Sequence, residues 1–289
     1  MKTAIIGASG FVGNYLWRSY KKEHPDCIGT AFSNSSNGHT FFDLRDPDVA
    51  RLNLEKTGHK AVIIASAKPN IAYCENHAEQ AFLVNVTGTL ALIKELAKAK
   101  IKIFFLSSDY VFDGKKGLYE DLSSTNPTTE YGRQKEIVEK EIPKVTDNYQ
   151  IIRLSKTYGL NKGDGTLLDE IAKNFLSNKK MNLAKDQFFS PTYIKDVVQI
   201  IKSIQKKSSS KIVNVAAPIR LSRYEVARQL GKQMKADLSL IDPISLHDIE
   251  SMNNRPLDTS LHCSYLNKFL GPLFTPWKDI LRSINENYC

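Results

Sequence analysis

The sequence predicts an α/β protein in which helices cover both faces of a doubly wound parallel sheet, with a smaller α/β part towards the C-terminus. Short β-rich runs alternate with longer helical patterns over the first two thirds of the chain, an order that is typical of parallel sheets. The run 61–65 is apolar throughout, as in a strand buried on both faces. The 289 residues are 42% hydrophobic and 25% charged, which suits one large globular unit or two coupled ones.

The N-terminal elements follow from the spacing of apolar residues. Val12, Leu16 and Tyr20 recur at helical spacing and predict a helix over 11–22. Pro47 fits the first turn of a helix over 46–56, and a long helix is expected over 78–100. Runs rich in β-branched and aromatic residues predict strands over 3–6, 27–32, 40–42, 61–65 and 101–106.

The remaining elements are bounded by turn and capping signals. A helix over 130–141 is expected to end before Pro143. Ser222, with Glu225 three residues later, has the pattern of a capping box and predicts a helix to about Met234. The other expected elements are a polar functional loop over 107–129, strands over 149–155 and 211–215, an extended piece over 181–183, helices over 166–176 and 193–205, and an irregular C-terminal region with short helices.

Composition argues against several classes of protein. No apolar run reaches the roughly 18 residues of a membrane span, and the N-terminus has no signal-peptide pattern, so we expect a cytoplasmic protein without a membrane partner. The net charge of +9 comes from scattered lysines without a nucleic-acid-binding motif, so we expect no nucleic-acid partner. The cysteines have no paired spacing, so we expect reduced thiols and no metal; they are Cys27, Cys74, Cys263 and Cys289.

A glycine-rich run follows the first predicted strand and opens the first helix. Its three glycines stand where a tight turn, the approach of a pyrophosphate and close helix–strand packing require them, and the helix N-terminus offers free N–H groups to phosphates. This predicts a Rossmann-type dinucleotide site built from Gly7, Ser9, Gly10, Phe11, Val12 and Gly13. We expect the dinucleotide-binding domain to span 1–155 with about 190–215, and a substrate-binding domain to comprise about 156–189 and 216–289.

The residues after the second predicted strand bear on the choice of dinucleotide. The run 31–36, which includes Ser33 as a candidate cofactor contact, has no carboxylate to bind the ribose 2′-hydroxyl of NAD. A 2′-phosphate would therefore meet no repulsion, although the run has no Arg or Lys to attract it either. We expect NADP(H), with NAD(H) as the alternative, and stronger binding of NAD than of NADP in a direct titration would contradict this.

A tyrosine and a lysine on the predicted helix over 130–141 suggest acid–base chemistry. Tyr131 and Lys135 share one helix face, and a nearby ammonium is expected to lower the pKa of a phenol from about 10. Such a phenol exchanges a proton with a carbonyl–alcohol pair. Tyr158 and Lys162 repeat the spacing within a glycine-containing loop, and we interpret this as accidental. Ser108 follows a strand, at the sheet edge where ligands bind, and could hold a substrate carbonyl.

Four ordered blocks of residues are more specific than any of these signals alone. They are Ser107-Ser108-Asp109-Tyr110-Val111-Phe112-Asp113-Gly114; Tyr131-Gly132 with Lys135; Asp186-Gln187 followed by Ser190-Pro191-Thr192; and Arg255-Pro256-Leu257-Asp258 before Trp277. Through them the chain resembles the dTDP-4-dehydrorhamnose reductase family of extended short-chain dehydrogenases/reductases along nearly its full length.

The resemblance implies that NADPH reduces the C4 ketone of a nucleotide-linked 4-keto-6-deoxy sugar, a reaction of polysaccharide biosynthesis. It implies that Tyr131 donates the proton, that Lys135 binds the nicotinamide ribose, and that Ser108 hydrogen-bonds the ketone. Further implied cofactor contacts are Asp43, Leu44, Ala65, Ser66, Ala67 and Asn85. Candidate substrate contacts are Asp109, Lys156, Gln187 and Arg255, whose guanidinium suits a diphosphate. The resemblance is compatible with a homodimer.

Two departures from the family pattern concern the substrate side. Lys156 stands where the family usually has Trp, and the segment 68–75 also differs, so the reductase chemistry is better supported than the identity of the sugar. Lys156 suggests a more anionic or more polar sugar, and an unchanged sugar preference in Lys156→Trp would count against that hypothesis.

Three other activities fit parts of the pattern. A sugar-nucleotide dehydratase is disfavoured because Tyr110 follows Asp109 where a Glu is expected. A sugar-nucleotide epimerase remains an alternative. A non-catalytic regulatory subunit similar to the β subunit of methionine adenosyltransferase is the third.

Overall fold

The computed structural model describes residues 1–33, 38–207, 210–249, 254–269 and 274–288. The chain forms two compact units, and each is built from several stretches of sequence. The first unit comprises Met1–Val111, Ser124–Leu154 and Ile201–Val213; the second comprises Phe112–Ser123, Ser155–Ile200 and Asn214–Cys289.

A five-stranded sheet forms the centre of the first unit, in the order β1-β4-β5-β6-β11. Strand β4 pairs in parallel with β1 and with β5, and β5 pairs in parallel with β6, so the expectation of a parallel α/β sheet is confirmed. A short parallel pair, β2 with β3, adjoins β1 through a bridge between Ile5 and Gly29. The strands are β1 (Thr3–Ile6), β2 (Thr30–Ala31), β3 (Thr40–Phe41), β4 (Ala61–Ile64), β5 (Lys102–Ser108), β6 (Tyr149–Leu154) and β11 (Ile212–Val215).

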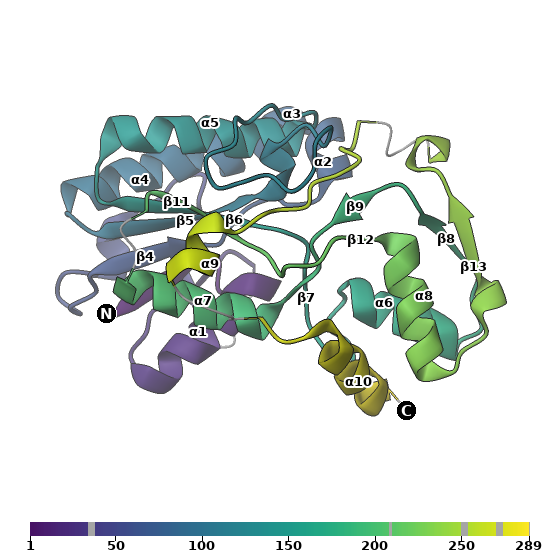
Figure 1. Cartoon of the computed structure of the whole chain (residues 1–289). Coiled ribbons are helices and arrows are strands. Elements are labelled where there is room, and N and C mark those ends of the chain that lie inside the picture. The colour runs from purple at the N-terminus through teal and green to yellow at the C-terminus, as the bar shows by residue number, and fades with distance from the viewer. Residues whose placement is uncertain (34–37, 208–209, 250–253, 270–273, 289) are drawn as a thin grey trace. The chain divides into compact units, whose positions relative to one another are not determined.

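Helices cover both faces of this sheet. Figure 1 shows α4 (Thr89–Lys98) and α5 (Glu130–Val145) on one face and α1 (Phe11–Glu23) on the other. Alternate strand residues such as Ile64 and Phe105 pack with Leu92 and Val138 of the helices in one buried apolar cluster. This core holds the carboxyl ends of β1, β4 and β5 in place, and the candidate site lies there.

Three of the predicted helices differ from the structure. Instead of a helix over 46–56 there is one 3₁₀ turn, η2 (Val49–Leu52), because Asn53 adopts a left-handed φ of 48° and ends it. The predicted helix over 78–100 contains a π-helical stretch, η3 (Leu83–Gly88), between α3 (Ala78–Phe82) and α4. Helix α5 continues through Pro143. Proline removes only its own N–H donor, and beyond it the Thr146 N–H still donates to the Ile142 carbonyl oxygen.

The second unit has a core of its own and mostly short strands. Its strands form the pairs β7 (Thr157–Tyr158) with β10 (Thr192–Tyr193), β9 (Phe188–Phe189) with β12 (Leu221–Ser222), and β8 (Met181–Ala184) with β13 (Ile241–Ile244). The predicted capping box is confirmed, because Ser222 and Glu225 exchange hydrogen bonds at the start of α8. The remaining helices of the chain are α2 (Ile71–Asn76), α6 (Leu167–Leu176), α7 (Ile194–Lys207), α8 (Arg223–Met234), α9 (Ser264–Phe269) and α10 (Trp277–Tyr288). Over the described part of the chain, no helix combines the length and the apolar character that a membrane span requires.

Candidate active site

The glycine-rich turn after β1 is closely packed at two of its three glycines. Gly7 has a φ of +89°, and a Cβ there would lie 2.6 Å from the backbone nitrogen of Ser66. A Cβ on Gly13 would lie 2.1 Å from the Gly7 carbonyl oxygen. These two glycines are therefore required by the protein itself, since they let α1 start directly against the ends of β1 and β4.

Gly10 is different, because no close protein neighbour explains it. A Cβ on Gly10 would lie 3.5 Å from its nearest protein atom, which is ordinary contact. The residue is exposed and is the N-cap of α1, where the first N–H groups of the helix are free for a ligand. Ser9 is also exposed, whereas Phe11 and Val12 are partly buried in the first turn. This end of α1 fits a phosphate group that approaches the backbone closely.

Two serine hydroxyls near the same sheet edge are buried and lack partners. Ser66 lies just beyond β4, and Ser107 lies near the end of β5. Among the described residues, neither Oγ has a hydrogen-bond partner in the protein. Because buried polar atoms are normally satisfied, such hydroxyls fit a site that a polar ligand completes. Ala65 and Ala67, also predicted to line the cofactor, flank Ser66 and are partly buried.

Tyr131 is positioned by the first turn of α5. The Thr129 hydroxyl caps this helix by accepting a hydrogen bond from the Gly132 N–H at 3.1 Å. A Cβ on Gly132 would lie 2.1 Å from the Tyr110 carbonyl oxygen, so only glycine lets the helix approach the segment after β5 this closely. The rings of Tyr110 and Tyr131 meet edge to face, with centroids 6.4 Å apart.

Lys135 lies one turn further along α5 and is buried. Its Nζ donates to the Leu106 carbonyl oxygen at 2.8 Å and lies 4.6 Å from the centre of the Phe105 ring. Burial lowers the pKa of Lys135 to about 8, and the carboxylate of Glu139 opposes this shift. An ammonium has three donors; Leu106 takes one, and the others are suited to ligand hydroxyls.

The pKa of Tyr131 moves in the direction opposite to the sequence-based expectation. Desolvation raises the pKa above its usual value, the carboxylate of Asp109 adds to the rise, and a hydrogen bond with Ser108 opposes it. The predicted lowering by Lys135 is wrong for this arrangement, because the Lys135 Nζ is 5.9 Å from the Tyr131 ring centre and donates to Leu106. The Tyr131 hydroxyl is therefore protonated at neutral pH and is suited to donate a proton.

Ser108 ends β5 and lies within hydrogen-bonding reach of Tyr131. Its hydroxyl donates to Asp109 Oδ1 at 3.0 Å and accepts from the Tyr110 N–H at 3.2 Å. Asp109 is buried, so its carboxylate orients the serine hydroxyl from within the protein. The structure thus places Ser108, Asp109, Tyr131 and Lys135 close to one another, and their catalytic and substrate-binding roles stay predictions.

Asn85, in the π-helical stretch, has its amide engaged by the protein. Its Oδ1 accepts from the Lys68 N–H at 2.7 Å, and its Nδ2 donates to Gln134 Oε1 at 2.7 Å. Gln134 lies between Tyr131 and Lys135 in the sequence, and sequence analysis missed it. Its side chain is fully buried and also donates to Glu130. Asn85 therefore ties the segment after β4 to α5, and its predicted contact with a cofactor stays a prediction.

The adenine-side candidates lie near the ends of β2 and β3. Leu44 is buried, and its carbonyl oxygen would lie 1.7 Å from a Cβ on Gly88, so the π-helical stretch packs directly on it. Asp43 pairs with Arg45 through a contact of 2.7 Å. Arg45 was missed by sequence analysis because it lies well beyond the run that ends β2. Ser33 is exposed.

The other substrate-side candidates belong to the second unit. The Gln187 side chain is buried and donates to the Pro256 carbonyl oxygen at 3.4 Å. Arg255 is partly buried, and its Nε has no hydrogen-bond partner among the described residues. Lys156 is exposed, and its carbonyl oxygen accepts from the Thr192 N–H. Their predicted roles towards a substrate stay predictions.

Among the residues that the structure describes, no group of three or more His, Cys, Asp or Glu side chains could hold a metal ion. Cys27, Cys74 and Cys263 are free and buried, and Cys289 lies outside the described residues.

A parallel sheet with a glycine-rich turn after β1, a serine at the carboxyl end of β5, and a tyrosine and a lysine on the helix α5 define the class of extended short-chain dehydrogenases/reductases. Within that class, the chain belongs to the family described as RmlD substrate binding domain, whose model matches residues 1–289.

Individual relatives differ in what their names state. The chain is 26% identical over 286 residues to the methionine adenosyltransferase 2 subunit beta of Xenopus tropicalis, covering 96% of this chain and 85% of that protein. It is 25% identical over 281 residues to a probable low-salt glycan biosynthesis reductase of Haloferax volcanii, covering 94% and 93%. A dTDP-4-dehydrorhamnose reductase of Bacillus anthracis, solved in complex with NADP, has the same fold, with a TM-score of 0.86, 21% identity and coverage of 98% and 99%.

Proposed function

We propose that this protein is an NAD(P)H-dependent sugar-nucleotide reductase that converts the C4 ketone of a nucleotide-linked 4-keto-6-deoxy sugar into an alcohol. The observation that carries the proposal is the arrangement of Ser108 beside a protonated Tyr131, with the buried Lys135 one helical turn away. Membership of the family and the similarity to a reductase of Haloferax volcanii support it.

In this reaction Tyr131, Ser108 and Lys135 have different roles. When bound, NADPH supplies a hydride to the ketone carbon. Tyr131 donates its hydroxyl proton to the ketone oxygen, and the Ser108 hydroxyl, turned from Asp109 Oδ1 towards the substrate, donates a hydrogen bond to the same oxygen. The Lys135 ammonium, held by Leu106, offers its remaining donors to the ribose hydroxyls of the cofactor.

The binding groups follow from the same proposal. Gly10 and the first turn of α1 bind the pyrophosphate of the cofactor, and the unpartnered Ser66 and Ser107 hydroxyls hydrogen-bond to the nicotinamide half. NADP(H) is the proposed cofactor and NAD(H) the alternative. The proposed substrate contacts are Asp109, Lys156, Gln187 and Arg255.

The direct test is oxidation of NADPH with a panel of nucleotide-linked 4-keto-6-deoxy sugars. Because Tyr131 supplies the proton, Tyr131→Phe is expected to lower kcat by about 10²–10⁴-fold while NADPH binding, measured by titration, is retained. The matched control is Tyr224→Phe, a partly buried tyrosine of α8 outside the site, which should keep wild-type activity. Absence of turnover with every sugar, despite NADPH binding, would contradict the reductase function.

A second candidate function is that of a regulatory subunit. It is favoured by the 26% identity to the methionine adenosyltransferase 2 subunit beta over 96% of this chain. In that case the protein would co-purify with a synthetase and change its kinetics, and Tyr131→Phe would leave this effect intact. Turnover of a sugar nucleotide that is lost in Tyr131→Phe would decide for the reductase.

A further inference from the structure

Two phenyl rings are exposed beyond the glycine-rich turn, at the ends of β2 and β3. The side chains of Phe32 and Phe41 are 52% and 51% exposed, and their ring centroids are 6.0 Å apart. Rings so exposed contribute little to the core of the protein. The two ring planes are inclined by 36° to each other, and an exposed ring face suits a planar ligand such as a nucleotide base.

A fixed guanidinium lies over one of these rings. The Arg45 guanidinium carbon is 4.7 Å from the centre of the Phe32 ring. Asp43 accepts from Arg45 Nε at 3.0 Å, from Nη2 at 2.7 Å and from the Arg45 backbone N–H at 2.9 Å. This pairing lowers the pKa of Asp43 and orients the guanidinium.

The surface lies where the adenosine end of a dinucleotide would extend. The Gly7 N–H donates to Thr30 Oγ1 at 3.1 Å, and the Ala8 N–H donates to the Thr30 carbonyl oxygen. The end of β2 is therefore adjacent to the glycine-rich turn. A dinucleotide whose pyrophosphate binds at that turn places its adenosine ribose beside the residues that follow the second strand.

We infer that Arg45 determines the dinucleotide specificity of this protein by binding the 2′-phosphate of NADP(H), with the adenine against Phe32. The inference rests on the proposed function and names the residue that selects the cofactor. A planar guanidinium binds phosphate oxygens through directed hydrogen bonds. The Asp43 carboxylate is occupied by Arg45.

The test uses two fragments that differ only in the 2′-phosphate, adenosine 2′,5′-bisphosphate and AMP, titrated calorimetrically against the full chain. The wild type is expected to bind the bisphosphate at least about tenfold more tightly than AMP. Arg45→Gln is expected to abolish this preference and to leave the affinity for AMP unchanged, while Arg45→Lys keeps part of it, because the charge remains and the planar fork is lost. The control is Arg51→Gln, an exposed arginine that pairs with Asp48 elsewhere in the first unit, which should retain the full preference.

The outcomes separate this inference from the proposed function. Retention of the preference in Arg45→Gln would overturn the role of Arg45 and leave the reductase intact. If the wild type bound the two fragments equally tightly, the role of Arg45 would also be overturned and the reductase function would be unaffected. Failure of both fragments to bind would overturn the dinucleotide site itself, and the inference with it. The affinity of the variants for AMP shows that each is folded.

Discussion

At the scale of single residues, Lys135 sets an upper pH limit on the proposed reaction. Burial lowers its pKa to about 8, so the ammonium dominates below that pH and is lost as the pH rises through it. Tyr131 stays protonated over this range because its own pKa is raised. We therefore expect kcat/KM for ketone reduction to fall as the pH rises through about 8, in a pH–rate profile measured with saturating NADPH.

Glu139 provides a variant that moves this limit. Its buried carboxylate pairs with Arg153 at 2.6 Å and raises the pKa of Lys135 against the effect of burial. Glu139→Gln removes that support, so the fall in kcat/KM should shift to lower pH by roughly one unit. Glu141→Gln is the control, because Glu141 pairs with Lys144 on the exposed side of α5. An unchanged profile in Glu139→Gln would mean that Lys135 does not set the limit.

At the scale of elements, we expect substitutions at two glycines of the glycine-rich turn to affect different properties, one the stability of the protein and the other NADPH binding. In Gly13→Ala the new Cβ would lie 2.1 Å from the Gly7 carbonyl oxygen, and we expect a loss of about 2 kcal/mol or more in the free energy of unfolding. In Gly10→Ala the nearest atom lies 3.5 Å away. We therefore expect stability within about 1 kcal/mol of wild type and NADPH binding weakened at least about tenfold. Chemical denaturation and NADPH titration check both. If Gly10→Ala bound NADPH with wild-type affinity, the pyrophosphate would not bind at Gly10.

The elements also show what a sequence can and cannot reveal. The capping box of α8 was predictable because Ser222 and Glu225 are three residues apart and satisfy each other locally. Arg45 was not, because its contact with Phe32 depends on the parallel pairing of β2 with β3. The direction of the Tyr131 pKa shift could not be predicted from the sequence either, because desolvation arises from packing against segments distant in the sequence.

At the scale of the whole molecule, the parallel sheet was the most predictable feature. Its strands give distinct apolar runs, and one such run, Ala61–Ile64, is buried at every residue. The second unit was less predictable because two of its strand pairs, β7 with β10 and β9 with β12, consist of strands of two residues, which carry no readable periodicity. Their pairing depends on contacts between remote segments rather than on a local pattern.

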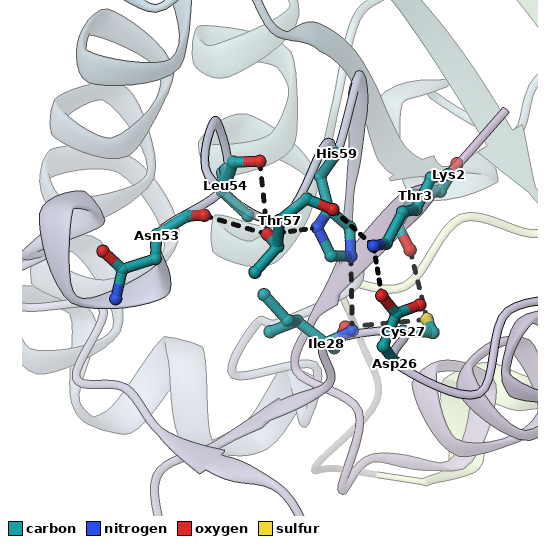
Figure 2. A network of polar contacts seen from close by, with 9 residues as sticks. All are labelled: Lys2, Thr3, Asp26, Cys27, Ile28, Asn53, Leu54, Thr57 and His59. Carbon is teal, nitrogen blue, oxygen red and sulfur yellow. Dashed lines mark hydrogen bonds and ion pairs between the residues drawn. The ribbon is translucent and has the colours of Figure 1, made fainter.

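At the amino-terminal edge of the sheet, a buried histidine makes stability depend on pH. Figure 2 shows His59 between Thr57 and Ile28, where Nδ1 contacts Thr57 Oγ1 at 2.7 Å and Nε2 accepts from the Ile28 N–H at 3.5 Å. The neutral ring with its proton on Nδ1 satisfies both contacts. Nearby, Lys2 pairs with Asp26, and burial together with the Lys2 charge lowers the pKa of His59.

Because the pKa of His59 is lower in the folded than in the unfolded chain, protonation favours unfolding. Its stabilising contribution is complete above the ordinary histidine pKa of about 6.5, declines as the pH falls below it, and levels off once the folded-state ring is itself protonated. We therefore expect the midpoint of urea unfolding to fall between pH 7.5 and pH 5.5, and to fall less in His59→Gln, which cannot titrate. His247→Gln removes an exposed histidine and should behave as the wild type. An equal fall in His59→Gln and in the wild type would assign the pH dependence to other groups.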